Sequence, residues 1–328
     1  MAVMSYAEAG KAALAREMRE DPSVWALGED LGRGGVFGQY KGLQQLFGER
    51  RVIDTPISES TIMGAAVGMA LVGLRPVVEM RVTDFALCAM DELVNQAAKN
   101  RYMFGGQGRV PLVARMPGGI WSSSAAQHSQ SLEAWFTHVP GLVVVAPATP
   151  ADNYALLRSA IACGDPVVYQ EHKELWSMQG EVPADHRVEL GRANLVRDGG
   201  DVTLVTWSKT VHAADEAAAR AAQLGISVEI IDLRTLWPWD RETVLASAAR
   251  TGMLLVVHEA VQASGFGAEI AATVAEAIGV PVRRLGAPRI PVGYSRPLED
   301  EARVGADRIF SAITAFLGTR GRTAAHAN

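Results

Sequence analysis

Residues 51–80 of the chain read RVIDTPISESTIMGAAVGMALVGLRPVVEM and hold two strand-like runs on either side of a helical pattern. The runs Arg51–Ile53 and Pro76–Met80 have the length of buried strands, and Ser60–Leu74 has the length of a helix. Mainly apolar strands that alternate with helices indicate a parallel sheet covered by helices on both faces. This stretch therefore predicts an α/β fold built on a doubly wound parallel sheet.

The same alternation extends through the first half of the chain. The other strand-like runs are Val24–Leu27, Val110–Ala114, Leu142–Ala146 and Pro166–Tyr169, and the other helical patterns are Asp84–Tyr102, Ser131–His138 and Pro150–Cys163. Residues 1–21 predict an amphipathic helix that is interrupted by charges and has no apolar signal core. The first half therefore reads as one α/β domain.

The alternation of strand-like and helical patterns stops near residue 171 and resumes at residue 201, after the polar stretches QGEVP, DHR and RDGGD. Beyond this point DVTLVTW, SVEIIDL, MLLVVHE and VPVRRL predict strands, and Val211–Leu224, Asp240–Thr251 and Gly267–Ile278 predict helices. We therefore predict a first domain over residues 1–175, a linker over 176–200 and a second α/β domain over 201–328. A length of 328 residues suits two domains at about 150 residues each.

Composition excludes several classes of protein. The 31 basic and 36 acidic residues give a net charge of −5 and form no basic stripe, which argues against nucleic-acid binding. The longest uncharged apolar stretch, Ser60–Leu74, is shorter than the roughly 20 residues that a membrane-spanning helix needs. Two cysteines without a CxxC motif fit reduced thiols. We expect a cytoplasmic protein with no membrane attachment.

Polar and aromatic residues follow three of the predicted strands, and a fourth segment that is rich in small residues carries a histidine. They are Glu29 and Asp30, then Glu59, then Arg81 to Phe85, and then His128 in the small-residue loop 118–130. Active sites of doubly wound sheets form at the carboxyl ends of their strands, so these residues are site candidates. Each also has a structural interpretation: the acids as solvated loop or helix-terminal residues, Phe85 as core.

Other familiar site motifs are missing. Neither GxGxxG between a strand and a helix nor GxxxxGK[ST] occurs, and Gly265-Phe266-Gly267 is only a weak phosphate-binding signal. The histidines lack zinc-ligand spacing, and no GxSxG surrounds Ser129. The sequence therefore predicts neither a zinc site nor a nucleotide site built by this chain alone.

Taken together, these segments resemble one family over nearly the whole chain. LGED, DTPISES, NQAAKNRYMFGG, AAQHSQSLEAWFTHVPG, EHKELWSMQGEVP, EIIDLRTLWPWD and VVHEAVQASGFGAEI are similar to beta subunits of thiamine-diphosphate-dependent 2-oxo acid dehydrogenases, which include pyruvate and acetoin dehydrogenases. The resemblance implies a pyrimidine-binding domain followed by a transketolase C-terminal-like domain. It also implies an oxidoreductase component.

The resemblance implies roles for five residues. Glu59 matches the glutamate that holds N1′ of the cofactor's aminopyrimidine and favours its imino tautomer. Phe85 matches the ring that stacks on the aminopyrimidine, Ile57 an apolar neighbour of the bent cofactor, and Glu29 an acid that supports the pyrimidine site. His128 matches the histidine that faces the thiazolium and transfers a proton when the acyl unit passes to lipoamide.

A motif that is absent points to a partner. The family holds magnesium and the diphosphate with a GDG…N segment, and no GDG occurs in this chain. The resemblance therefore implies that magnesium is held by a separate alpha subunit, with the site shared in an alpha2beta2 heterotetramer. It also implies a lipoyl acyltransferase component as the next partner. The glycines of Ser60–Leu74 then fit either close packing within the domain or a subunit interface.

Two further features concern ions and substrate. The family binds potassium through backbone carbonyls at positions that match Leu112, Ala160, Cys163 and Asp165, and Cys163 departs from the acidic or polar residue usual there. Arg81 stands where relatives carry an uncharged residue. Its guanidinium could meet a substrate carboxylate, pair with Asp84 or point outward.

The sequence thus predicts a beta subunit that acts on pyruvate-type 2-oxo acids or acetoin and passes the acyl unit to lipoamide. A thiamine-diphosphate enzyme that forms acyloins or transfers ketol groups without lipoamide is an alternative with the same chemistry. A non-catalytic α/β scaffold is an alternative of another class. The joint presence of Glu59, Phe85 and His128 argues against the scaffold.

Overall fold

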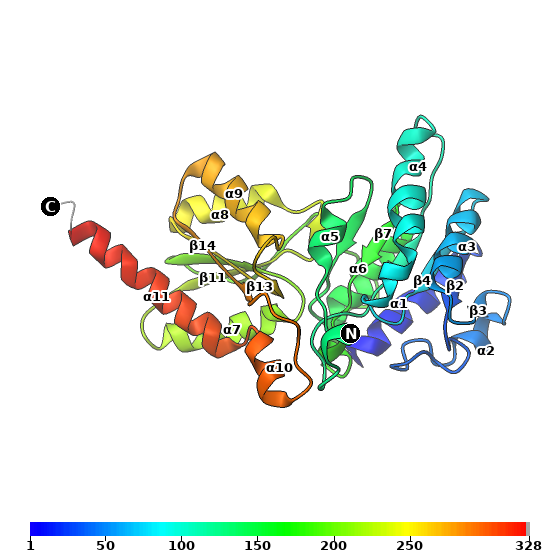
Figure 1. Ribbon diagram of the computed structural model, residues 1–328, viewed down its shortest axis with the longest axis horizontal. Coiled ribbons are helices and arrows are strands. Elements are labelled where there is room, and N and C mark those ends of the chain that lie inside the picture. Colours follow the sequence, from blue (N-terminus) through cyan, green and yellow to red (C-terminus); the bar gives the residue numbers. More distant parts are fainter. Residues whose placement is uncertain (326–328) are drawn as a thin grey trace.

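The computed structural model describes residues 1–325 and divides their strands among a seven-stranded, a five-stranded and a two-stranded sheet. Figure 1 shows the two larger sheets side by side, with helices flanking each of them. The α/β fold with parallel sheets expected from the sequence is confirmed. The last three residues of the predicted second domain lie outside the described part of the chain.

The first sheet has the strand order β12-β6-β7-β5-β4-β2-β3 and is parallel apart from β12. Its strands are β2 (Val24–Gly28), β3 (Val52–Asp54), β4 (Arg75–Glu79), β5 (Val113–Arg115), β6 (Val143–Val145), β7 (Val167–Tyr169) and β12 (Thr235–Trp237). The helices of this half are α1 (Tyr6–Glu20), α2 (Leu43–Phe47), α3 (Glu59–Leu71), α4 (Ala98–Met103), α5 (Glu133–Thr137) and α6 (Pro150–Ala162).

The second sheet has the order β14-β13-β10-β11-β9, in which only β9 is antiparallel to its neighbour. Its strands are β9 (Asn194–Arg197), β10 (Val202–Thr206), β11 (Val228–Asp232), β13 (Leu254–Val261) and β14 (Val282–Ala287). Its helices are α7 (Thr210–Ala222), α8 (Arg241–Thr251), α9 (Gly267–Ile278), α10 (Arg296–Ala302) and α11 (Ala306–Ala325). In Figure 1, α8 and α9 cover one face of this sheet, while α7 and α11 cover the other.

Local sequence explains where the main helices begin and end. Ser5 caps α1 in a capping box with Glu8, and Thr149 accepts a hydrogen bond from the Asp152 amide before Pro150 opens α6. Gly252 and Gly279 end α8 and α9 in the left-handed conformation that glycine adopts without strain. The apolar faces of these helices bury continuous clusters against both sheets.

Several local predictions were incomplete. The N-terminal helix is preceded by β1 (Ala2–Ser5), which pairs with β8 (Gln179–Val182) inside the expected linker, and β9 also lies in that segment. The helix expected over Asp84–Tyr102 consists of a 3₁₀ turn, a π segment and the short α4. The helices α2, α10 and α11 were not predicted. Such pairings and irregular turns depend on distant neighbours that a local pattern does not contain.

The structure also gives β12 an unexpected position. Residues 235–237 follow β11 of the second sheet but pair with β6 of the first, next to the Arg234 contact with Ala146. One strand from the second half of the chain thus completes the first sheet. Within residues 1–325, no helix combines the length and the apolar character needed to cross a bilayer.

Candidate functional site

The four candidate segments meet at one edge of the first sheet. Strands β3, β2, β4 and β5 are consecutive neighbours and run parallel, so their carboxyl ends lie side by side. The segments that leave these ends carry Glu29, Glu59, Arg81 to Phe85 and the 118–130 loop. The fold therefore brings together residues that are up to 99 positions apart in the sequence (128 − 29 = 99).

Two carboxylates occupy the ends of β2 and β3. Glu29 is buried. It follows Gly28, which packs so closely on β4 that an added Cβ would lie 2.8 Å from both the Cβ and the backbone oxygen of Glu79. Burial raises the pKa of Glu29, and the nearby Glu59 carboxylate raises it further, while Arg81 opposes the shift. Glu59 is the first residue of α3 and is half-buried. Burial and the neighbouring charge therefore favour the protonated form of Glu29 at this edge.

Arg81 lies against these acids. Its Nη1 is 3.1 Å from Asp30 Oδ2 and 3.5 Å from Glu29 Oε2, and its backbone has a φ of 54°. Arg81 pairs with Glu29 and Asp30 and not with Asp84, whose Oδ1 accepts a hydrogen bond from Gln130 Nε2 at 2.8 Å. The side chain keeps about a third of its surface exposed, at 37%. Some guanidinium donors therefore still face solvent.

Phe85 and His128 form an aromatic pair in the same region. Their ring centroids are 5.1 Å apart and the rings meet edge to face at 81°. Phe85 is half-buried at the start of the 3₁₀ turn 85–89, and His128 is exposed. The Lys173 ammonium donates a hydrogen bond to the His128 backbone carbonyl. Ile57, just before α3, is 77% exposed, which leaves an apolar side chain uncovered beside the two acids.

A buried ionic group supports this edge and was missed from the sequence. Arg115 at the end of β5 donates to Glu171 at 2.8 Å through both Nε and Nη2, and both side chains are fully buried. Next to them, burial raises the pKa of Glu79 to about 7, in spite of the Arg115 charge. Charged residues at the ends of otherwise apolar strands were the signal that could have revealed the group.

The carbonyls that match the family's potassium ligands lie around the end of α6. The Leu112 oxygen accepts from the Val167 amide at 2.9 Å, and the Ala160 oxygen accepts from the Cys163 amide at 3.1 Å. The Cys163 oxygen accepts from Arg75 Nη1 at 3.0 Å, while the Asp165 carboxylate pairs with Arg101 at 2.5 Å. A carbonyl oxygen has two lone pairs, so the oxygens of Leu112, Ala160 and Cys163, each of which accepts one hydrogen bond named above, keep a second lone pair for an ion.

Among the residues that the structure describes, no cluster of three or more His, Cys, Asp or Glu side chains could hold a metal ion. The acids and the aromatic pair instead suit a planar, nitrogen-rich ring. A carboxylate can hold the proton at a ring nitrogen, and an aromatic face can stack on the ring. The residues present therefore fit an aminopyrimidine.

Comparison with known proteins defines the class. Residues 2–178 match the family model "Transketolase, pyrimidine binding domain", and residues 191–309 match "Transketolase, C-terminal domain". A solved structure described as a split-gene transketolase, an inactive beta4 tetramer, superposes with a TM-score of 0.82 over 96% of this chain and 98% of its own, at 23% identity. The chain is thus a transketolase-like protein of two domains.

Curated relatives narrow the family. The beta subunit of acetoin:2,6-dichlorophenolindophenol oxidoreductase from Cupriavidus necator is 46% identical over 88% of this chain and 90% of the relative. The 2-oxoisovalerate dehydrogenase subunit beta of Bacillus subtilis is 41% identical over 95% and 98%. The pyruvate dehydrogenase E1 component subunit beta of Rhizobium meliloti is 41% identical over 96% and 70%. The chain belongs to this family of beta subunits of thiamine-diphosphate-dependent dehydrogenases.

Proposed function

We propose that this chain forms the pyrimidine half of a thiamine-diphosphate site that it shares with an alpha subunit. The observation that carries the proposal is the convergence of Glu29, Glu59, Phe85 and His128 from four neighbouring strand ends. The chemistry that thiamine diphosphate supplies when bound is a nucleophilic carbon that also serves as an electron sink. The reaction is the oxidative cleavage of a 2-oxo acid or of acetoin.

Glu59 and Glu29 handle the proton of the aminopyrimidine in this proposal. Glu59 would hold a proton at N1′. Glu29 lies close enough to affect the charge of this group, so the proton would be shared among the two carboxylates and the ring. The raised pKa of Glu29, to which burial and the Glu59 charge both contribute, supports this assignment. Phe85 offers its ring face for stacking, and the uncovered Ile57 side chain supports the bent cofactor.

His128 moves a proton at the substrate side. Its ring is exposed while its edge-to-face contact with Phe85 sets its direction. An imidazole can donate to a substrate oxygen and later take the proton back near neutral pH. We assign to it the proton transfer that accompanies passage of the acyl unit to the lipoyl group of an acyltransferase component.

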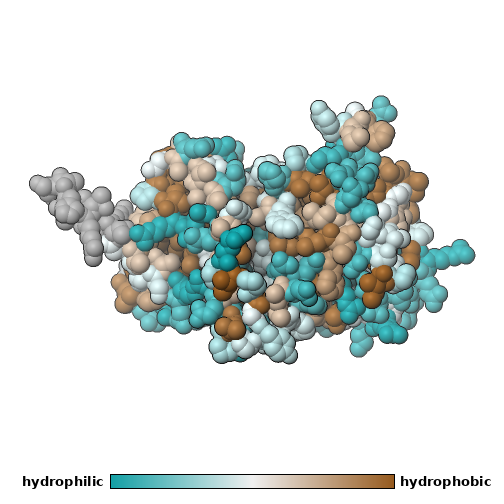
Figure 2. All heavy atoms as spheres, in the orientation of Figure 1, coloured by the Kyte–Doolittle hydropathy of each residue, from teal (hydrophilic) through white to brown (hydrophobic). Residues whose placement is uncertain are grey.

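Two features support an alpha partner. The described chain offers no acidic cluster for the magnesium that accompanies the diphosphate, so we assign magnesium to the alpha subunit. Apolar side chains are exposed around the outer end of α4, where Figure 2 shows brown and tan surface, and include Tyr102, Met103 and Phe104. Such a patch marks a protein interface. An alpha2beta2 heterotetramer would cover it.

The exposed face of α3 supports the same interface. Gly68 has open space where a Cβ would stand, and Leu71 and Val72 at the end of the helix are 51% and 80% exposed. The opposite face, with Ile62 and Met63, packs into the core. We therefore favour the subunit-interface interpretation of the small residues in this helix.

We keep three finer assignments as proposals. A potassium ion would use the second lone pairs of the Leu112, Ala160 and Cys163 carbonyls, with the Asp165 backbone as a further ligand. The chain would divide into a first domain of residues 1–175, a linker over 176–200 and a second domain of residues 201–328. The protein would act in the cytoplasm. One hydrophobic cluster confined to the first half and its following segment and one confined to the second half support this division in part, although a third cluster joins both sheets.

Calorimetric titration with thiamine diphosphate tests the shared site. We expect binding only when the chain is combined with its alpha partner, because one chain holds half of the ligand contacts. In the assembled enzyme, Glu59→Gln should slow the exchange of the cofactor's C2 proton by at least about 100-fold. Binding by the lone chain, or unchanged exchange in the variant, refutes the proposal.

Substrate turnover decides among the related reactions. Pyruvate, branched 2-oxo acids and acetoin are offered to the assembled enzyme with an artificial electron acceptor and, separately, with a lipoyl acyltransferase component. Reduction of the acceptor together with lipoyl-dependent turnover supports the dehydrogenase. Acyloin formation without any oxidation would support the lipoamide-independent alternative, and no turnover with an intact assembly would support a scaffold.

A further inference from the structure

The loop that carries His128 contains strained backbone positions. Ser122, Ser123 and Ala125 have φ values of 44°, 56° and 62°, in the left-handed region that residues with a Cβ adopt at a cost. Three such residues within four positions persist only when surrounding groups fix them. The contacts of this loop therefore show what determines the position of His128.

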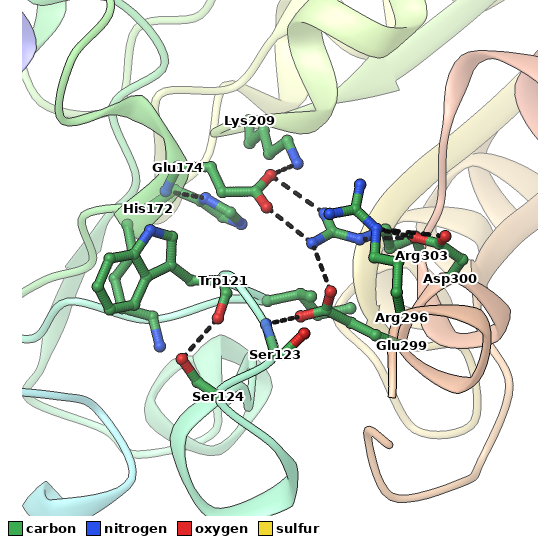
Figure 3. A network of polar contacts seen from close by, with 12 residues as sticks. Trp121, Ser123, Ser124, His172, Glu174, Lys209, Arg296, Glu299, Asp300 and Arg303 are labelled. Carbon is green, nitrogen blue, oxygen red and sulfur yellow. Dashed lines mark hydrogen bonds and ion pairs between the residues drawn. The ribbon is translucent and has the colours of Figure 1, made fainter. Parts of the chain in front are cut away.

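One anchor comes from α10 in the second half of the chain. The Ser123 amide donates to Glu299 Oε1 at 2.9 Å, and the Glu299 side chain is completely buried. Figure 3 shows Glu299 reaching from its helix to the loop next to Trp121 and Ser124. The bond joins the strained part of the loop to a residue 176 positions later in the sequence.

The second anchor is Glu259, near the end of β13. Its Oε1 accepts from the Ile120 amide at 2.8 Å and lies 3.0 Å from His172 Nε2. His172 Nδ1 accepts from the Glu174 amide, so Nε2 carries the proton and donates to Glu259. Burial raises the pKa of Glu259, but His172 and the Ile120 amide outweigh burial and bring it to about 2. The Glu259 carboxylate is therefore charged at neutral pH.

An ionic network holds the first anchor in turn. Arg303 contacts Glu299 at 3.3 Å and pairs with Glu174 through two bonds of 2.7 and 3.1 Å. Lys209 adds a further contact to Glu174, as the dashed lines of Figure 3 show. Because Glu174 belongs to the first half of the chain, this network joins the two halves next to the loop. Glu299 thus has a fixed position relative to the first sheet.

From these contacts we propose that Glu299 and Glu259 are positioning residues for His128, so that the second α/β unit (residues 201–325) sets the geometry of the catalytic loop. The inference rests on the proposed role of His128. Neither carboxylate touches the cofactor or the substrate in this scheme; each acts by accepting a loop amide. The second unit is then part of the catalytic apparatus and serves more than assembly.

The test uses the assembled enzyme with variants at position 299. Glu299→Met removes the acceptor of the Ser123 amide, and Glu299→Asp keeps the buried charge but shortens the side chain by one methylene. Glu299→Gln retains an oxygen acceptor and serves as the rescue variant. Glu301→Met is the matched control, because Glu301 lies on the same helix and is exposed.

Three quantities are measured: turnover with lipoyl transfer, exchange of the cofactor's C2 proton, and deuterium uptake by peptides that cover residues 118–130. For Glu299→Met and Glu299→Asp we expect turnover to fall about 10- to 100-fold with KM within twofold, because misplacement of a catalytic group by about 1 Å has effects of this size. C2 exchange should stay within twofold and loop uptake should rise. Glu299→Gln should recover most of the turnover.

Other outcomes overturn the inference. Turnover equal to that of Glu301→Met in both Glu299→Met and Glu299→Asp would show that the anchor is irrelevant. A parallel fall of turnover and C2 exchange would show a general structural role. Absence of C2 exchange in the unmodified assembly would refute the proposed function, not the anchoring. Loop uptake then decides the anchoring alone, and equal uptake in Glu299→Met and Glu301→Met refutes it.

Discussion

At the scale of single residues, the candidate site contains acidic and basic side chains that differ in how deeply they are buried. Glu29 is buried beside Glu59, and Arg81 compensates part of their charge. Glu79 lies beneath them with its pKa raised to about 7 by burial. The carboxyl ends of these strands therefore collect acids whose protonation depends on their surroundings. Two predictions follow from individual members of the group.

Arg81 should distinguish substrates that carry a carboxylate from those that do not. We predict that Arg81→Met lowers kcat/KM for 2-oxo acids by about 10- to 100-fold, the loss expected for one charge-assisted hydrogen bond. Acetoin has no carboxylate, so its turnover should fall by a smaller factor, which reflects only the effect of Arg81 on the Glu29 charge. Arg33→Met is the control, because Arg33 is 88% exposed and also faces Asp30. Equal losses for both substrates would contradict a role in recognition.

Glu79 should make stability depend on pH. Its pKa is raised from 4.5 to about 7 in the folded chain, so the folded state binds more protons than the unfolded state between these values. Its contribution to stability is therefore present at pH 4.5 and is lost as pH rises to about 7. The loss is on the order of 3 kcal/mol at most.

We predict that Glu79→Gln is more stable than the unmodified chain at pH 8 and that the difference shrinks towards pH 5. Urea unfolding at both pH values measures it. Glu189→Gln serves as a control, because Glu189 is 77% exposed and should show no such trend. A difference that is independent of pH would mean that Glu79 is ionised in the folded chain at both values.

At the scale of elements, glycines decide how closely segments approach each other. Gly265 and Gly267, whose motif suggested a weak phosphate site, instead pack on the buried His258 ring, where a Cβ would lie 2.7 and 2.8 Å from ring atoms. His258 also stacks on Trp207, with ring centroids 5.2 Å apart. Glycine is therefore needed here because helix α9 begins directly against an aromatic layer.

Gly141 gives a sharper case. It has a φ of 100°, and a Cβ on it would overlap the Ala98 carbonyl oxygen at the start of α4. We predict that Gly141→Ala costs about 1–2 kcal/mol from the backbone conformation and about 1–3 kcal/mol from overpacking. Gly225→Ala isolates the first part, because Gly225 has a φ of 76° and open space around it. Equal losses in urea unfolding would refute the steric contribution.

At the scale of the whole molecule, the two sheets are joined by several contacts of different kinds. Strand β12 leaves the second half to pair with β6, Trp207 donates to Glu133 at 3.0 Å, and Arg234 contacts Asp152 at 2.6 Å. These groups are almost fully buried, so water does not screen them. The halves are therefore expected to depend on each other for stability.

Truncation tests this dependence. A fragment of residues 1–190 lacks β12 and exposes β6 as a bare sheet edge, which favours association with other chains. We predict that it aggregates on size-exclusion chromatography, whereas the full chain, which retains β12 and the whole second sheet, does not. A monodisperse 1–190 fragment that unfolds cooperatively would contradict the prediction.

The sequence alone determined the fold class, the alternating order of the main strands and helices, and the family. These follow from the local period of apolar residues and from short motifs such as DTPISES, which a linear chain displays directly. It also identified Glu59, Phe85 and His128 as candidates. The Arg81 partners were left open, because contacts between strand ends depend on the order of strands in the sheet.

Only the tertiary structure decided which distant groups meet. The pairing of β12 with the first sheet, the buried pair of Arg115 and Glu171, and the anchoring of the His128 loop by Glu299 all join residues far apart in the chain. Such contacts are selected by burial and by the need to satisfy every buried charge and amide once the sheets have packed. The physical reason is that the neighbours of a charge or an amide in the sequence do not indicate which distant group it will contact. The spacing of apolar residues, in contrast, indicates directly whether a segment forms a strand or a helix.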